Sequence, residues 1–164
     1  KSSSRLYGTC ESFASNAIDG NTGGVWGTDL LTHTESEANA WWQVDLGSSW
    51  AIDSIDVWNR TDSSVVNRLF PFTVSILNGT GSTLWSAIYN TLGSTHMVFD
   101  PSALIDGQLV KIQLNDTNYL HLAEVQVWAD DGNTLSAVPE PSTVLLLGSG
   151  LVGLAWYGRK RNKS

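Results

Sequence analysis

The sequence predicts an all-β domain, either a sandwich or a barrel, from three observations. Four stretches alternate apolar and polar residues with a period of two, which is typical of strands that bury one face. Polar turn sequences separate these stretches. Residues 1–130 contain no convincing pattern of a long amphipathic helix. Short strands separated by polar turns favour a sandwich or barrel.

The four predicted strands lie at residues 42–46, 72–77, 110–115 and 124–128. In each of them the apolar residues recur at every second position and are expected to face the core. These core residues are Trp42, Val44 and Leu46, then Phe72, Val74 and Ile76, then Val110, Ile112 and Leu114, and finally Val125 and Val127. Turns are expected at Asp19-Gly20-Asn21, Leu46-Gly47-Ser48, Asn78-Gly79, Leu92-Gly93 and Asp106-Gly107.

The composition restricts the class of protein. The chain has 164 residues, enough for one domain with a proper core, and its net charge is -7. Nucleic-acid binding is not expected, because neutralising phosphates requires a basic face. Only 15% of the residues are charged and eight are Trp, which suits a secreted β-protein. The single cysteine, Cys10, rules out a disulfide within the chain.

The C-terminal segment, residues 138–164, differs in character from the preceding domain and follows a polar linker at residues 131–137. Its triplet Pro139-Glu140-Pro141 precedes 17 residues without charge, 142–158, and then a basic cluster, 159–163. An apolar run of this length is at the short end for a transmembrane helix, and the basic cluster fits a cytoplasmic flank. The alternative, a buried core helix, is disfavoured because the run is glycine-rich, terminal and detached by the linker.

This order of a Pro-Glu-Pro triplet, an apolar helix and a basic end closely resembles the PEP-CTERM sorting signal of bacterial exported proteins. The resemblance implies export across the inner membrane and transient anchoring in it by a helix at about residues 142–158. It also implies processing near Pro139 by an exosortase-type enzyme. The protein would then reside in the cell envelope or outside the cell, where such proteins accompany extracellular polysaccharide.

Two scarce cations mark the candidate binding segment. Before residue 131 the chain has only five Lys or Arg residues, and two of them, Arg60 and Arg68, lie close together beside Asp62. His33 lies upstream of this pair. Arg offers a rigid fork of hydrogen-bond donors and His offers a donor or an acceptor, so together they suit a ligand that presents hydroxyl oxygens.

The spacing of these residues carries a second resemblance. Twenty-six residues separate His33 from Arg60, which begins an Arg-Thr-Asp triplet, and the domain ends in Leu-Ala-Glu-Val-Gln-Val-Trp. With residues 16–22 and 41–47, these motifs resemble the F-type, or fucose-binding, lectins of the discoidin (coagulation factor C-type), galactose-binding-like group. The resemblance spans most of residues 10–128 and implies a jelly-roll β-sandwich of about eight strands.

The same resemblance implies a sugar site in the loops at one end of the sandwich. His33, Arg60 and Arg68 would hold the ring oxygen and the axial hydroxyl that L-fucose and galactose-type sugars share. Asp62 would hold Arg60 in place, and Trp26 would pack against the apolar face or a methyl group of the sugar. For Trp26, a place at the rim or in the core is an equal alternative.

The sequence departs from the family motif after Asp62. Five residues precede Arg68 where the motif has four, and Ser63-Ser64 stands where many relatives have adjacent cysteines. A loop absorbs one extra residue at small cost, so Arg68 can still reach the site. The alternative is a structural matrix or adhesion protein that keeps the fold without a working sugar pocket.

The resemblance also implies a structural calcium ion. On local grounds alone, the oxygen-rich residues 16–22 favour a simple turn over a calcium loop. The family implies Ca2+ held by oxygens of Asn16, Asp19, Asn21 and Glu124 and by the carbonyls of Leu30 and Ala123. Glu124 lies in an otherwise apolar strand, where it needs a partner unless it faces outward.

No arrangement in the sequence predicts catalysis. Asp53 and Asp56 flank Ile55 in a strand and are expected to face solvent, and no acid and base pair is defensible. His96 and His121 lack metal-ligand spacing and are expected at the surface or as satisfied core residues. We therefore predict a non-enzymatic, calcium-supported carbohydrate-binding protein that is exported.

Overall fold

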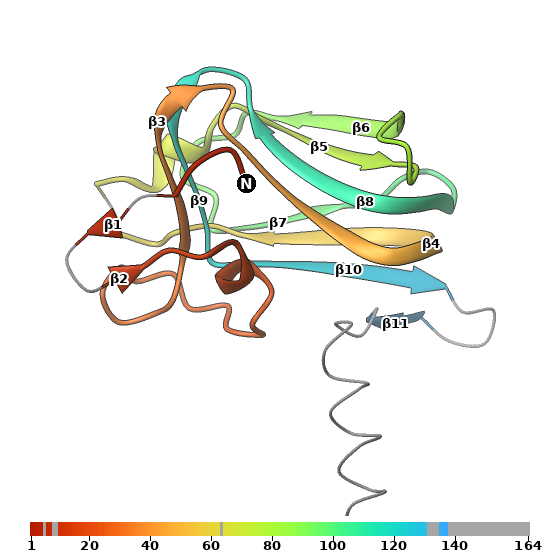
Figure 1. Ribbon diagram of the computed structural model, residues 1–164, viewed down its shortest axis with the longest axis horizontal. Coiled ribbons are helices and arrows are strands. Elements are labelled where there is room, and N and C mark those ends of the chain that lie inside the picture. Colours follow the sequence, from red (N-terminus) through yellow and green to blue (C-terminus); the bar gives the residue numbers. More distant parts are fainter. Residues whose placement is uncertain (5, 8–9, 63, 131–134, 138–164) are drawn as a thin grey trace, which may run out of the picture.

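The described part of the chain forms a β-sandwich (Figure 1). The computed structural model describes residues 1–4, 6–7, 10–62, 64–130 and 135–137. Its strands are β1 (Leu6–Tyr7), β2 (Cys10–Glu11), β3 (Thr32–Ala38), β4 (Trp41–Trp58), β5 (Phe72–Leu77), β6 (Thr83–Tyr89), β7 (His96–Phe99), β8 (Ile105–Leu114), β9 (Thr117–Leu122), β10 (Glu124–Asp130) and β11 (Leu135–Ala137). Two short 3-10 helices, η1 (Ala14–Ala17) and η2 (Val66–Leu69), lie between them. The all-β prediction is confirmed.

Strand β4 is the longest strand and organises the large sheet. The sheet has seven strands in the order β11-β10-β4-β8-β5-β6, and β7 pairs with β4 beside this path. β4 pairs with β8 from Trp41 to Ile52, and its last residues pair with β10 up to Trp58. The pairings are antiparallel, and of these only β5 and β6 are consecutive strands joined by a short turn.

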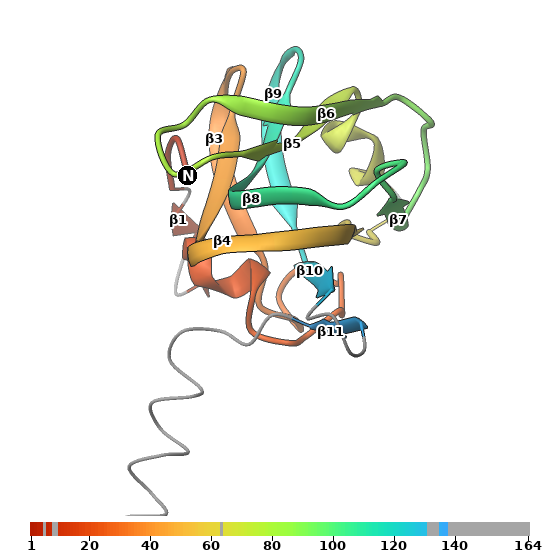
Figure 2. The ribbon, with the colours of Figure 1, turned by 90° about the vertical axis from the view of Figure 1, so that its right-hand side faces the viewer.

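Strands β3 and β9 form a separate antiparallel pair that crosses one end of the large sheet (Figures 1 and 2). His33 pairs with His121 in this ladder, and a register shift follows before Ser36 pairs with Tyr119. Helix η2 packs against β9. The segment between β4 and β5 therefore lies at the same end of the molecule as β3.

The core lies within the curve of the large sheet, and the alternation read from the sequence predicts most of it. The fully buried members of the predicted core are Phe72, Val74, Ile76, Val110 and Ile112, with Trp42 and Leu114 only 1% exposed. Burying each such side chain contributes roughly 1.5–3 kcal/mol to folding. Val44 and Leu46 are only half-buried, near the point where β4 shifts its register with β8.

Asp56 lies on the sheet face opposite the core, as predicted, beside the exposed Val98, but it is largely covered. Its side chain is 14% exposed, because β4 is flanked by β7 and β10 at this point and both neighbours supply N–H groups. Trp128 donates its indole N–H to Asp56 Oδ2 over 2.6 Å, and His96 Nε2 lies 2.9 Å from Oδ1. His96 itself is 45% exposed, as predicted for a surface residue.

The end of the predicted linker is a strand. Residues 135–137 form β11, which pairs with β10 over Trp128–Asp130. These residues carry no charge, and they cover the edge of β10 that would otherwise end the sheet. The predicted sorting segment, including the apolar run at residues 142–158, lies outside the described residues. Within the described part of the chain, no helix has the length and apolar character needed to cross a membrane.

Candidate functional site

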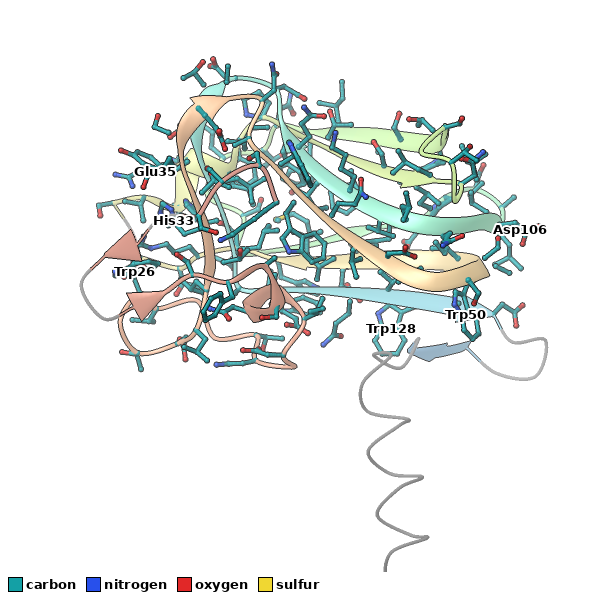
Figure 3. The ribbon with its side chains drawn as sticks, in the orientation of Figure 1. Trp26, His33, Glu35, Trp50, Asp106 and Trp128 are labelled. Atoms are coloured by element: carbon teal, nitrogen blue, oxygen red, sulfur yellow. The ribbon has the colours of Figure 1, made fainter. Side chains whose placement is uncertain are left out.

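Four predicted site residues come from three segments that meet at one end of the sandwich. Trp26 lies in the loop that leads into β3, and His33 is the second residue of β3. Arg60 and Asp62 follow the end of β4. Trp26 and His33 lie together at this end, far from Trp50 and Asp106 at the opposite end (Figure 3).

Asp62 joins the Arg60 side chain to the Trp26 loop. Arg60 donates from Nε to Asp62 Oδ2 over 2.5 Å, and the same oxygen accepts the backbone N–H of Trp26 over 3.1 Å. Partial burial alone would raise the pKa of Asp62. The hydrogen bonds from Arg60 and Trp26 and the guanidinium charge outweigh burial and lower this pKa below its ordinary value. Asp62 therefore stays ionised and orients Arg60, which is the arrangement expected for a supporting residue.

The Trp26 ring is shared by Arg60 and His33. The Arg60 Cζ atom lies 4.9 Å from the centre of the indole, and the His33 ring meets the indole at 5.3 Å with its edge toward it. Trp26 is half-buried, so it is a rim residue and not a core residue. A small pocket beside it is lined by Ser12 and residues 26–31.

Gly24 permits this contact between two distant segments. Its carbonyl accepts the N–H of Thr61 over 2.8 Å, so the Trp26 loop runs against the chain that carries Arg60. A Cβ atom at Gly24 would lie only 2.7 Å from the carbonyl oxygen of Asn59. A residue with a side chain would therefore push the two segments apart.

The backbone carbonyl of Thr34 holds the His33 ring in one tautomer. Its Nδ1 lies 2.6 Å from the carbonyl oxygen of Thr34, and a carbonyl only accepts, so Nδ1 carries the proton. In the neutral imidazole Nε2 is then the acceptor. The His33 ring is 3% exposed and also contacts the ring of Tyr119 at 5.4 Å.

Arg68 reaches the same cluster despite the extra residue in its loop. It lies in η2, and its Cζ atom is 5.0 Å from the centre of the Tyr119 ring, which contacts His33. Among the described residues, the Arg68 guanidinium has this ring contact but makes no hydrogen bond or ion pair. Its N–H donors therefore remain for a ligand or for water.

His121 belongs to this cluster and was missed from the sequence. It is fully buried opposite His33, with 5.7 Å between the ring centres. Neither ring nitrogen makes a well-formed hydrogen bond with a described residue, so the prediction of a surface or satisfied core residue is wrong. Burial first, and then the nearby His33, Arg60 and Arg68, lower the pKa of His121 to about 3, which the Val65 backbone only partly offsets. The imidazole is therefore neutral at neutral pH.

The predicted calcium ligands lie around the contact between residues 16–21 and the start of β10. Glu124 is only 3% exposed, so the alternative of an outward-facing carboxylate is wrong. Its Oε1 accepts the N–H of Gly20 over 3.2 Å, which joins the loop to β10. Asn16 is 7% exposed and donates to the carbonyl of Leu31, the neighbour of Leu30. Ala123 precedes Glu124 and is fully buried.

Asp19 and Asn21 also build the turn that the sequence favours on local grounds. Asp19 Oδ1 accepts the N–H of Asn21 over 2.8 Å, and Asn21 Oδ1 accepts the N–H of Gly23 over 2.9 Å. Within the described ranges, no group of three or more His, Cys, Asp or Glu residues is placed to hold a metal. The predicted set has only two carboxylates, and its other donors are amide and carbonyl oxygens, which calcium accepts.

Comparison with known proteins matches both parts of the chain. The model of the NedA-like, galactose-binding F5/8 type C domain matches residues 16–101, and the PEP-CTERM protein-sorting motif matches residues 137–161. Fucolectin-6 of Anguilla japonica is 35% identical over 129 residues, which cover 76% of this chain and 69% of that protein. The chain belongs to the fucolectin, or F-type lectin, family. The resemblance read from the motif spacing is confirmed.

Solved structures agree with this membership. The lectin domain of lectinolysin, complexed with Lewis B antigen, is 36% identical with a TM-score of 0.72, covering 79% of this chain and 89% of that one. A fucose-binding module of Streptococcus pneumoniae is 28% identical with a TM-score of 0.71, covering 79% and 91%. This fucolectin-family domain thus has the predicted galactose-binding-like sandwich, and its relatives are lectins and binding modules, in line with the prediction of a non-enzyme.

Proposed function

We propose that this fucolectin-family domain is a carbohydrate-binding lectin for fucose or a galactose-configured sugar. The observation that carries the proposal is the convergence of Arg60, Arg68 and His33 around the rings of Trp26 and Tyr119. Proteins named as fucolectins and fucose-binding modules are among its relatives, which supports the same ligand class.

The chemistry of the cluster suits a sugar. Among the described residues, Arg60 uses only Nε for Asp62, and its terminal N–H groups are suited to donate in pairs to neighbouring hydroxyl oxygens. His33 adds an imidazole to the same cluster, and the half-buried Trp26 ring supplies an apolar surface for sugar C–H groups. For one such site we expect a Kd between about 1 mM and 1 μM, or about -4 to -8 kcal/mol.

Calorimetry on the full chain in detergent tests this function with L-fucose, galactose and glucose. We expect fucose or galactose to bind, glucose to bind poorly, and R60A to abolish binding. K111A is the matched control. Lys111 is another of the five cations before residue 131, but it lies over the ring of Trp41, outside the cluster. Binding that R60A leaves unchanged would place the sugar elsewhere on the molecule.

The alternative of a structural matrix or adhesion protein has its own outcome in this experiment. If no monosaccharide binds, while the full-length protein still adheres to cell surfaces without competition by free sugar, the sandwich acts as an adhesion domain. The cation cluster would then have no ligand of this class.

Calcium support is the second part of the proposal. The buried Glu124 carboxylate, with Asp19 and the oxygens of Asn16 and Asn21, provides the hard oxygen donors that calcium prefers. When bound, the ion would neutralise the buried carboxylate and lock residues 16–21 to β10. Its role is structural, since these residues lie apart from the Arg60 and His33 pair in the contacts described above.

Export is the third part. The PEP-CTERM motif at residues 137–161 supports transfer to the cell envelope, anchoring by the apolar run at 142–158 and processing by an exosortase-type enzyme. The carbohydrate partner would then be fucose- or galactose-bearing extracellular polysaccharide. Replacing Pro139-Glu140-Pro141 by alanines should leave the protein membrane-bound and unprocessed in fractionated cells. Normal processing of that variant would contradict this part of the proposal.

A further inference from the structure

We propose that Asn59 is the positioning residue that brings both arginines of the sugar site into one cluster. The inference rests on the proposed function, because it concerns how the same site is assembled. Asn59 is the last residue before Arg60 and is fully buried. A fully buried amide must have its hydrogen bonds made, so its partners report what it holds in place.

The Asn59 side chain joins three segments at once. Its Oδ1 accepts the backbone N–H of Arg60 over 2.7 Å. Its Nδ2 donates to the carbonyl of Val66 over 2.9 Å and to the carbonyl of Ser94 over 3.0 Å. The backbone N–H of Asn59 also donates to the carbonyl of Thr95 over 2.8 Å. One side chain therefore ties the chain at Arg60, the start of η2 and the segment before β7.

The bond to Val66 determines where Arg68 lies. Val66 begins η2 and Arg68 is two residues further along the same short helix. The segment from Asp62 to η2 closes on itself through bonds from the N–H groups of Val65 and Val66 to the Asp62 carbonyl, at 3.0 and 3.2 Å. Asn59 then docks this closed loop onto the end of β4. This docking explains how the loop absorbs its extra residue while Arg68 still reaches Tyr119.

A second contact between the same loops serves as an internal control. Asn67 accepts the N–H of Gly93 through Oδ1 over 2.8 Å, but Asn67 is exposed and makes no bond to the Arg60 segment. Replacing either asparagine by alanine removes a link between η2 and the 93–95 segment. Only the replacement of Asn59 also releases Arg60, so only Asn59 is expected to control the sugar site.

A double-mutant cycle on the full chain tests the proposal. Fucose affinity is measured by calorimetry for the wild type, N59A, R68A and the double variant, with N67A as control. We expect R68A to weaken binding about tenfold, because it removes about one charged hydrogen bond, and N59A to weaken it at least as much, because N59A releases Arg60 as well as the loop of Arg68. The double variant should be little weaker than N59A alone, because N59A already removes the Arg68 contact. Independent, multiplying effects, or an unchanged affinity of N59A, would overturn the proposal.

Amide hydrogen exchange on the unliganded protein provides a readout that does not need sugar. In N59A the amides of residues 62–69 and 93–95 should exchange about tenfold faster or more, while those of β5 and β8 stay protected. Uniformly faster exchange would mean general destabilisation, and unchanged exchange would mean that Asn59 does not hold the loop; both contradict the proposal. N59S, which keeps a small polar group, is the variant to use if N59A does not fold. Failure of the wild type to bind any sugar would instead refute the proposed function, and the exchange result would still decide the role of Asn59.

Discussion

His33 and His121 face each other on β3 and β9, with their ring centres 5.7 Å apart and both rings almost fully buried. Arg60 and Arg68 lie close enough to act on His121. A third positive charge in this cluster would be strongly disfavoured, because charges repel each other more strongly where water is excluded. His121 therefore stays neutral beside the two guanidinium groups.

The first prediction concerns acid stability. The folded pKa of His121 is about 3, below the ordinary value of 6.5, so the unfolded chain binds this proton first as the pH falls. The free energy of unfolding should therefore decrease from about pH 6.5 down to about pH 3, by up to about 1.4 kcal/mol per pH unit from this group. Urea denaturation at several pH values in this window measures the slope.

H121L is the control for this prediction. Leucine fills a similar volume and has no polar atom to satisfy, so the variant should be at least as stable as the wild type at neutral pH. It should also lose the part of the acid slope that comes from His121. An identical slope in both proteins would mean that other groups cause the loss of stability in acid.

The second prediction concerns the support of Arg60. D62N keeps an oxygen that accepts from Arg60 Nε but removes the negative charge that orients the guanidinium. Charge-assisted bonds are roughly twice as strong as neutral ones, so fucose affinity should fall about tenfold. Calorimetry measures the change, with D106N as control, because Asp106 is exposed at the opposite end of the sandwich (Figure 3). Equal losses in D62N and D106N would contradict a local role for Asp62.

The third prediction concerns the close approach of the Trp26 loop to Arg60. G24A places a Cβ atom against the carbonyl oxygen of Asn59 and should push the loop outward. We expect a destabilisation of about 1–3 kcal/mol from overpacking, together with weaker sugar binding. Thermal unfolding and calorimetry on the same sample measure both effects. G81A is the comparison: Gly81 lies in the turn between β5 and β6 at a φ of +86°, so its substitution should also destabilise the fold but should not change affinity.

The fourth prediction concerns calcium. If residues 16–21 and Glu124 hold the ion, adding calcium to chelator-treated protein should raise the unfolding temperature, and saturating metal should add about 2.7 kcal/mol at a hundredfold excess over Kd. E124Q should abolish this response, because it removes the buried carboxylate. The D106N variant should respond as the wild type does. A response that survives in E124Q would move the ion to another site.

Much of the fold follows from local patterns in the sequence. Period-two alternation identifies β5 and β8 and the faces that they bury, because alternate side chains of any strand point to opposite sides. It does not identify the cover over Glu124 and Asp56, because both side chains lie opposite the apolar face of their strands and residues distant in the sequence pack over them. It also misses β11, since three uncharged residues form a strand only where an open sheet edge is beside them.

The sequence by itself determined four of the strands and their apolar faces, the family, and the spacing that places His33, Arg60 and Asp62 in one motif. Those properties depend on residues near one another in the chain or on a fixed count between them. Only the tertiary structure decided that His121 lies beneath His33, that Gly24 touches Asn59, and that Asn59 docks the loop of Arg68. The physical reason is that each of these contacts depends on which strands become neighbours and in what register, and no local pattern encodes that choice.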